Sequence, residues 1–159
     1  MKFTIALALA AAPFLSAQAA AQSVEAKPGN CAVWAEEASK IVQVDARFDA
    51  ETRTSVVGAL DTFAGAQRQI MADGMAKTYA DSAAFGWDKA KVDAMIAQNE
   101  EIMRQRFTSP RMEPGKLYMD HIMYLNACVQ ANTQDSQYGM GRQDFIDKMT
   151  PAISIAQQG

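Results

Sequence analysis

The one histidine of the chain, His121, directly follows Asp120 and marks the only place with a side chain suited to general-base chemistry near neutral pH. Successive residues of a helix point about 100° apart, so Asp120 is poorly placed to orient the imidazole as a catalytic carboxylate does. The sequence also lacks a Gly-x-Ser-x-Gly elbow, a His-Glu-x-x-His motif and a glycine-rich phosphate loop. We therefore interpret His121 as a structural residue, expect no cofactor, and predict that the protein is not an enzyme.

Methionines offer a second kind of chemistry, because Met119 and Met123 flank His121. Thioether sulfur binds Cu(I) well, and a histidine with a methionine is a known pair of haem ligands. On a helix the two methionines share one face while His121 points to the other side, so such a site needs further ligands from other helices. A carrier of a metal or of non-covalent haem on these three residues is therefore our alternative hypothesis. Methionine as the filler of a helical core explains Met119 and Met123 without any ligand, and it explains the other methionines beyond the signal, among them Met71, Met75 and Met95, in the same way.

A strip of small residues, Gly58, Thr62 and Gly65, lies on one side of a predicted helix. Glycine inside a helix costs about 1 kcal/mol relative to alanine, so two glycines on one face suggest a packing reason. A smooth strip lets another helix approach closely, and that helix belongs either to a protein partner or to the last helix of the same chain. Trp87, beside Gly86 in a predicted loop, is a further candidate contact residue. Gly58, Thr62, Gly65 and Trp87 are thus the candidate partner-binding residues.

The elements that position these residues are all predicted to be helices, because apolar residues recur at intervals of three and four after residue 30. Asn30, Asp49 and Asp88 are each placed to cap the helix that follows. No stretch shows the sustained alternation of a strand. The predicted helices cover 31–42, 50 to beyond 71, 89–107, 114–131 (opened by Pro114 and Gly115) and a short segment around 145–149 that Pro151 kinks or ends, with connections at 80–86 and 132–141. The predicted fold class is an all-α bundle of four to five helices.

The N-terminus carries the pattern of an export signal. Lys2 is followed by an uncharged, mostly apolar run over residues 3–15 and by two small-x-small cleavage sites, at 17–19 and 19–21. The run is too short for a comfortable membrane span, which takes about 20 apolar residues. We predict a cleaved signal peptide over residues 1–21 and a periplasmic or secreted protein with no membrane insertion after cleavage.

The two cysteines, Cys31 and Cys128, constrain how the helices pack. In an exported chain an isolated pair normally forms a disulfide. Because Cys31 begins the first predicted helix and Cys128 lies near the end of the fourth, a bond between them is easiest if these two helices are antiparallel. The resulting register pairs three residues of each helix: Trp34 with Leu125, Ala38 with His121 and Ile41 with Tyr118.

Composition limits the class of protein. With 159 residues, 49% of them hydrophobic and 21% charged, the chain has the length and apolar content of one folded domain. We place a polar leader at residues 22–30 and a single helical domain at 31–159. The net charge of −3 provides no positive field, so we expect no nucleic-acid partner. These observations favour a small exported binding module, without catalysis, that acts on a protein partner in the cell envelope.

Overall fold

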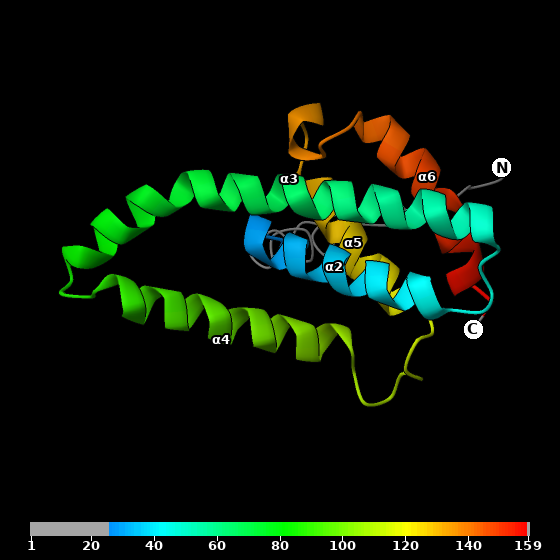
Figure 1. Cartoon of the computed structure of the whole chain (residues 1–159), viewed down its shortest axis with the longest axis horizontal. Coiled ribbons are helices and arrows are strands. Elements are labelled where there is room, and N and C mark those ends of the chain that lie inside the picture. The colour runs from blue at the N-terminus through cyan, green and yellow to red at the C-terminus, as the bar shows by residue number, and fades with distance from the viewer. Residues whose placement is uncertain (1–25, 159) are drawn as a thin grey trace, which may run out of the picture.

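The structure is a computed structural model that describes residues 26–158, so the predicted signal peptide and the first part of the predicted leader lie outside the described residues. The described chain contains five α-helices, one short 3-10 helix and no strand (Figure 1). The elements are α2 (Pro28–Val44), α3 (Ala50–Ala83), α4 (Lys89–Phe107), α5 (Met119–Ala131), η1 (Asp135–Gln137) and α6 (Arg142–Ala156). The all-α bundle is confirmed.

The first helix, α2, begins at Pro28, so the predicted cap at Asn30 is wrong. Proline suits the first turn of a helix because the N–H that it lacks would have no partner there. Asn30 instead lies inside the helix and is buried, and its side-chain oxygen accepts a hydrogen bond of 2.9 Å from Asn99 Nδ2 on α4. The helix therefore begins three residues earlier than the sequence suggested, and the preceding segment ends at Lys27.

The two aspartate caps are confirmed. Asp49 and Asp88 each accept a hydrogen bond of 2.8 Å from the amide of the residue three positions on. The helix that Asp49 opens, α3, is 34 residues long and ends at Ala83. It therefore includes the first half of the stretch 80–86 that we expected to be a connection. The chain reverses at Gly86, whose φ of 75° is strained for any residue with a Cβ atom.

The helix that carries His121, α5, begins at Met119 and not at Pro114 and Gly115. Gly115 has a φ of 76°, so the chain turns at this residue instead of entering a helix. The helix begins where Tyr118 N donates a hydrogen bond of 3.0 Å to His121 Nδ1. Proline and glycine occur both at helix starts and in turns, and the spacing alone does not separate the two cases.

The last helix, α6, continues through Pro151 to Ala156, so the expectation of a short helix that Pro151 ends is wrong. Pro151 removes the hydrogen bond to the carbonyl group of Asp147, and both residues are exposed, so water can take the missing bond. The opposite face of the helix is held in the core by Phe145 and Met149. Burial of that face keeps the helix whole.

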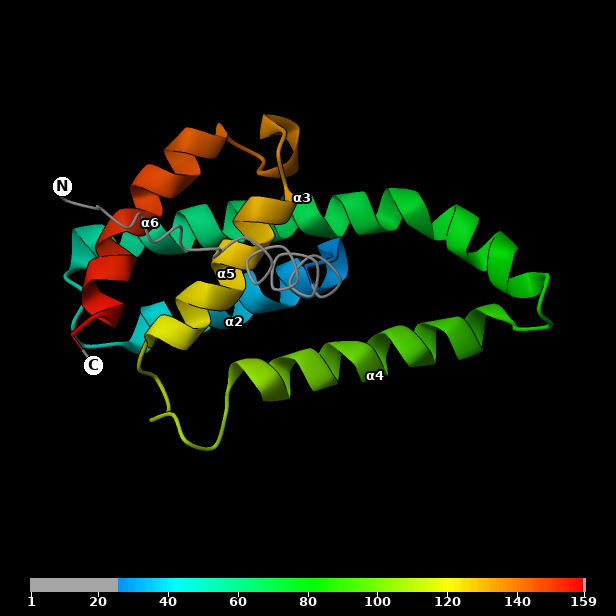
Figure 2. The ribbon, with the colours of Figure 1, turned by 180° about the vertical axis from the view of Figure 1, so that it is seen from behind.

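The Cys31–Cys128 disulfide is confirmed, with 2.06 Å between the sulfur atoms and 5.7 Å between the Cα atoms. It joins the start of α2 to the end of α5, and the two helices run in opposite directions with an oblique crossing (Figures 1 and 2). The ring centroids of Trp34 and Tyr124 are 4.9 Å apart. Trp34 therefore packs on the turn of α5 around Leu125, as the antiparallel register predicts.

Burial is uneven along α3. The first half of this helix carries buried residues from Val56 to Gln67, but from residue 68 to residue 102 only Val92 is buried. Figure 1 shows the second half of α3 and the facing part of α4 extending beyond α2 to a turn. We call residues 68–102 the arm and the other described residues the body.

Candidate functional site

His121 is buried at the joint between α4 and α5. Its Nδ1 accepts the hydrogen bond from Tyr118 N, and its ring centroid lies 4.6 Å from that of Phe107. Burial lowers the pKa of His121 below the ordinary value of 6.5, while the backbone of Phe107 and the charge of Asp120 act in the opposite direction. The imidazole caps α5 and packs against the last residue of α4, which accounts for its place in the core.

The residues of the metal or haem hypothesis do not come together. Met119 and Met123 line a hollow between α5 and α6, whereas His121 lines a different hollow against the loop that precedes α5. His121 Nδ1 is engaged by its hydrogen bond, and Nε2 is shielded from solvent. Within residues 26–158 there is also no group of three His, Cys, Asp or Glu side chains that could hold a metal ion. The geometry therefore adds no support to a carrier on these residues.

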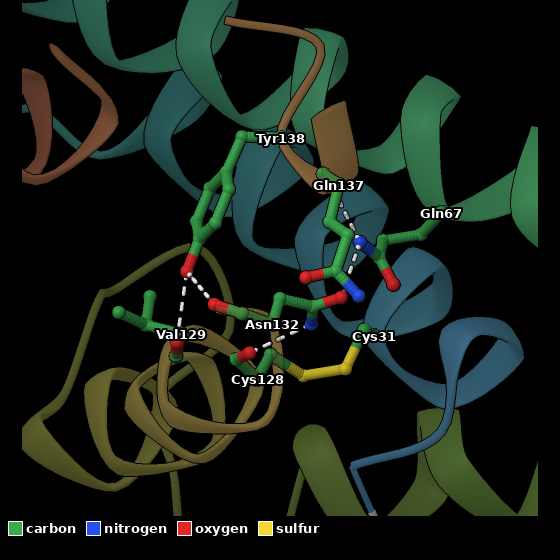
Figure 3. The surroundings of a disulfide bond; sticks show 7 residues. All are labelled: Cys31, Gln67, Cys128, Val129, Asn132, Gln137 and Tyr138. Carbon is green, nitrogen blue, oxygen red and sulfur yellow. Dashed lines mark hydrogen bonds between the residues drawn. A yellow bond between two sulfur atoms is a disulfide. The ribbon is translucent and has the colours of Figure 1, made fainter. Parts of the chain in front are cut away.

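A hydrogen-bond network surrounds the disulfide (Figure 3). Gln67 Nε2 donates to Asn132 Oδ1 (3.1 Å) and to the carbonyl oxygen of Gln137 (2.6 Å). Asn132 Nδ2 donates to the carbonyl oxygen of Cys128 (2.7 Å), and the hydroxyl of Tyr138 lies 2.7 Å from the carbonyl oxygen of Asn132. In the sequence Gln67 interrupts the apolar stripe of its helix, and this network pairs its side-chain nitrogen in the core. These hydrogen bonds link α3 to the end of α5 and to η1.

A second polar cluster holds the other end of α2. Asp45 accepts hydrogen bonds from Arg47 Nη2 (2.7 Å) and Leu117 N (2.8 Å), and Arg47 donates to the carbonyl oxygens of Leu117 (2.6 Å) and Ile155 (3.0 Å). Burial alone raises the pKa of Asp45, but the hydrogen bonds from Arg47 and Leu117 outweigh it and lower the pKa from 3.8 to about 2. Asp45 therefore stays ionised and links α2 to the loop before α5 and, through Arg47, to α6.

Ion pairs join the arm to the body. Arg68 on α3 contacts Glu36 on α2, with 2.8 Å between Nε and Oε1, and also pairs with Glu100 on α4. Arg104 lies 3.3 Å from Glu100 and 3.5 Å from Glu37. The hydrogen bonds from Arg68 to Glu36 and Glu100 raise the pKa of Arg68 despite its partial burial. Three helices are thus held together at the base of the arm.

Further polar contacts fasten the arm near its tip. The hydroxyl of Tyr79 on α3 lies 2.5 Å from Asp93 Oδ1 on α4, and Lys89 Nζ lies 2.5 Å from Asp93 Oδ2. The ammonium group of Lys91, in the first turn of α4, lies 4.7 Å from the centroid of the Trp87 ring in the preceding connection. The helices α3 and α4 are therefore linked both at the base and near the tip of the arm.

Between these links the arm encloses an apolar hollow of about 540 Å³, which we call the groove. The walls come from α3 and α4 and the floor from the start of α2. The charged residues of the lining, Lys27 and Glu100, lie toward the base, and the rest of the lining is uncharged. The large apolar side chains of the groove are Ile70, Met71, Met75, Trp87, Met95 and Ile96. Hollows of this size hold small organic ligands or apolar side chains of a partner.

The predicted partner-binding residues are separated in space. Trp87 lines the groove, whereas Gly58 and Gly65 lie on the first half of α3, and about 27 Å of helix separates Gly65 from the end of α3. Both glycines are exposed, and a Cβ atom at either position would meet no atom within 4 Å. Thr62 instead lies close to the loop between η1 and α6, since a Cβ atom at Gly139 in that loop would lie 3.0 Å from Thr62 Cγ2. The two glycines are open, and their role in binding a partner stays a prediction.

Sequence reasoning missed the groove although its pattern is visible. Met71 and Met75 are four residues apart on α3, and Met95 and Ile96 lie on the facing helix. Such spacing is typical of a core stripe, and we interpreted the methionines as core filler. The stripe stays partly exposed because α3 and α4 extend beyond the body. The spacing of residues within one helix does not indicate how far that helix extends beyond its neighbours.

No helix within residues 26–158 combines the length and the hydropathy of a membrane span. The chain matches no protein-family model, and neither a curated protein nor a solved structure shows significant similarity to it.

Proposed function

We propose that the protein is a small exported helical binding module, without catalysis, that holds an apolar segment of a protein partner of the cell envelope in its groove. The observation that carries the proposal is the arm, where only Val92 is buried between residues 68 and 102 although the inner face is lined by large apolar side chains. A contiguous apolar face that stays accessible is typical of an interaction surface. A partner that covers this face gains the free energy of removing it from water.

The lining of the groove indicates what kind of segment fits. Its walls are uncharged between the base and the tip, so a bound segment must present an apolar face there. Methionine side chains are flexible and polarizable, and surfaces rich in them adapt to different apolar shapes. The second half of α3, from Arg68 to Ala83, is about 22 Å long, which matches about four turns of an amphipathic helix. An amphipathic helix of the partner is therefore the occupant that we favour.

An exported location agrees with the disulfide, because disulfides persist in oxidising compartments. The signal pattern over residues 1–21 supports the same proposal. The intact mass of the protein recovered from the envelope fraction should correspond to a chain that begins near Ala20 or Gln22. A chain that retains Met1 and is recovered from the cytoplasm with reduced cysteines would contradict export.

Site-specific crosslinking in living cells tests the binding surface. A photoreactive benzophenone amino acid in place of Met95 lies in the groove, and the same amino acid in place of Lys77 lies on the arm outside its lining, where the side chain is 80% exposed. We expect irradiation to yield a discrete adduct with an envelope protein from position 95 and none from position 77.

A third crosslinker position, at Gly65, separates the groove from the strip of small residues. An adduct from Gly65 but not from Met95 would assign binding to the strip and overturn the groove. Equal adducts from Met95 and Lys77 would show that the contacts are unspecific. The absence of any adduct, with normal accumulation of all three variants, would refute a stable protein partner.

A further inference from the structure

Three methionines converge on the groove from its two walls. Met71 and Met75 lie one turn apart on α3, and Met95 lies on α4. The sulfur of Met71 reaches the floor, since a Cβ atom at Gly29 would lie 2.9 Å from Met71 Sδ. The thioethers thus form a large part of the apolar surface that the groove offers to a ligand.

These methionines are more accessible than the two core methionines of the body, Met103 and Met149, whereas Met123 on the surface of the body is itself 58% exposed. Met95 is 46% exposed, and Met71 and Met75 are partly exposed. Met103 and Met149, which pack in the core, are only 5% and 6% exposed. Oxidation of methionine requires contact between the sulfur and the oxidant, so exposure orders the methionines by susceptibility.

We propose that Met71, Met75 and Met95 are oxidation sites, and that a peroxide which converts them to methionine sulfoxide weakens the binding of apolar ligands in the groove. The inference rests on the proposed function only in taking the groove as a binding surface. It adds a form of regulation, in which an oxidant in the surroundings releases the ligand.

The reaction needs only hydrogen peroxide as co-reactant. A lone pair of the thioether sulfur attacks one peroxide oxygen, so that an S–O bond forms and the O–O bond breaks. The hydroxide that leaves takes the proton from the sulfur-bound oxygen and departs as water. The sulfur is oxidised by two electrons, and the peroxide is reduced by the same two.

The product is a poor lining for an apolar site. A sulfoxide carries a strong dipole with a hydrogen-bond-accepting oxygen, and covering that oxygen with an apolar ligand removes its water without offering a donor. The ligand therefore binds more weakly, by roughly tenfold or more for a groove with all three sulfoxides. The body keeps its fold under the same treatment because Met103 and Met149 are shielded.

The first measurement follows the modification itself. The disulfide-intact protein is treated with hydrogen peroxide, and sulfoxide at each methionine is followed by peptide mass mapping. We expect oxidation at Met95, Met71 and Met75 to be at least about tenfold faster than at Met103 and Met149. Oxidation of the core methionines at the rate of the groove methionines would overturn the inference.

The second measurement follows binding with the anionic dye 1-anilinonaphthalene-8-sulfonate, whose aromatic rings bind apolar surface, titrated before and after peroxide treatment. In the wild type the apparent Kd should rise about tenfold and return after treatment with an excess of pre-reduced reductases for both sulfoxide epimers, without added dithiol, so that the Cys31–Cys128 disulfide stays intact. In the M71L/M75L/M95L variant the ratio of the Kd values after and before peroxide should be close to one, since leucine does not react. In the control variant M119L/M123L, altered in the hollow between α5 and α6, the ratio should equal that of the wild type.

An unchanged wild-type affinity after full oxidation of Met71, Met75 and Met95 would overturn the inference, as would an equal loss in the triple leucine variant. Failure of the disulfide-intact protein to bind the dye before peroxide treatment would overturn the inference too, since there would be no accessible apolar face to modify. The dye replaces the partner in these tests. A protein whose dye binding responds to peroxide but that crosslinks to no envelope protein would therefore keep this inference and lose the proposed function.

Discussion

The body and the arm are both built from amphipathic helices, yet they treat their apolar residues in opposite ways. In the body the rings of Phe63, Tyr138 and Phe145 are buried together, with centroids 4.9 to 5.5 Å apart. In the arm Phe85 is 81% exposed, and the methionines of the groove are partly exposed as well. The body thus has a closed hydrophobic core, whereas the arm has an apolar inner face that no described segment of the chain fully covers.

The contrast is visible within the single helix α3. Its first half packs against α2 and α6, while its second half lies in the arm opposite α4. The helical period is the same in both halves, so the period does not account for the difference in burial, whereas the neighbouring helices do. An amphipathic stripe therefore marks a face that favours burial, and the tertiary structure determines what buries it.

The largest effect is expected from the disulfide, which belongs to the body alone. Replacing Cys31 and Cys128 by serine releases a loop that spans 97 residues and should lower the free energy of unfolding by up to about 5 kcal/mol. Urea unfolding without reductant measures this loss. The reduced wild type is the matched control and should unfold at the same urea concentration as the variant.

Hydrogen exchange of the serine variant tests whether body and arm respond separately. Amide protection should fall in α2 and α5, while the arm, which has little core, should change less. A loss of protection that begins in the arm and leaves α2 and α5 protected would show that the disulfide stabilises the arm, and would contradict the independence of arm and body.

One substitution made in both regions tests the comparison directly. Phe63→Ala opens a cavity in the core of the body and should cost about 4 kcal/mol, whereas Phe85→Ala at the exposed tip should change stability by less than about 0.5 kcal/mol. Thermal or urea unfolding of the two variants is the measurement. Similar losses from both would mean that the tip is packed in solution.

Acid unfolding reports on the body through Asp45. Because its pKa is lowered from 3.8 to about 2 in the folded protein, the ionised carboxylate stabilises the fold at any pH above 3.8. That contribution, about 2 kcal/mol, is lost as the pH falls from about 4 to about 2. Asp45→Asn should therefore be less stable at pH 7 and lose less between pH 4 and pH 2. An equal loss of stability between pH 4 and pH 2 in the wild type and in Asp45→Asn would contradict this role of Asp45.

The smallest effects compare two glycines of α3. A Cβ atom at Gly65 in the body or at Gly74 in the arm meets no atom within 4 Å. Gly65→Ala should raise the free energy of global unfolding by about 0.5–1 kcal/mol, because alanine favours the helix. Gly74→Ala should leave global unfolding nearly unchanged and slow hydrogen exchange in the arm, if the arm opens without the body. An equal gain from both variants would show that α3 unfolds as one unit.

The helical elements could be predicted because their signals are local. Asp49 and Asp88 cap their helices through hydrogen bonds to residues three positions away. The cysteine pair was sufficient to predict the disulfide and the antiparallel direction of α2 and α5. The start of α5 could not be predicted, since Gly115 and Asp45 together turn the chain there, and Asp45 is distant in sequence.

The candidate site was predicted only in part, and Trp87 is the one predicted contact residue that lines the groove. Helical period, the aspartate caps and cysteine content are properties of short stretches and of compartment chemistry, so the amino-acid sequence alone determines them. Whether a given apolar stripe is buried depends on which other helices reach it. The stripes around Phe63 and Met75 share the helical period, and only the folded chain places α2 and α6 against the first while α3 and α4 leave the second as an open groove.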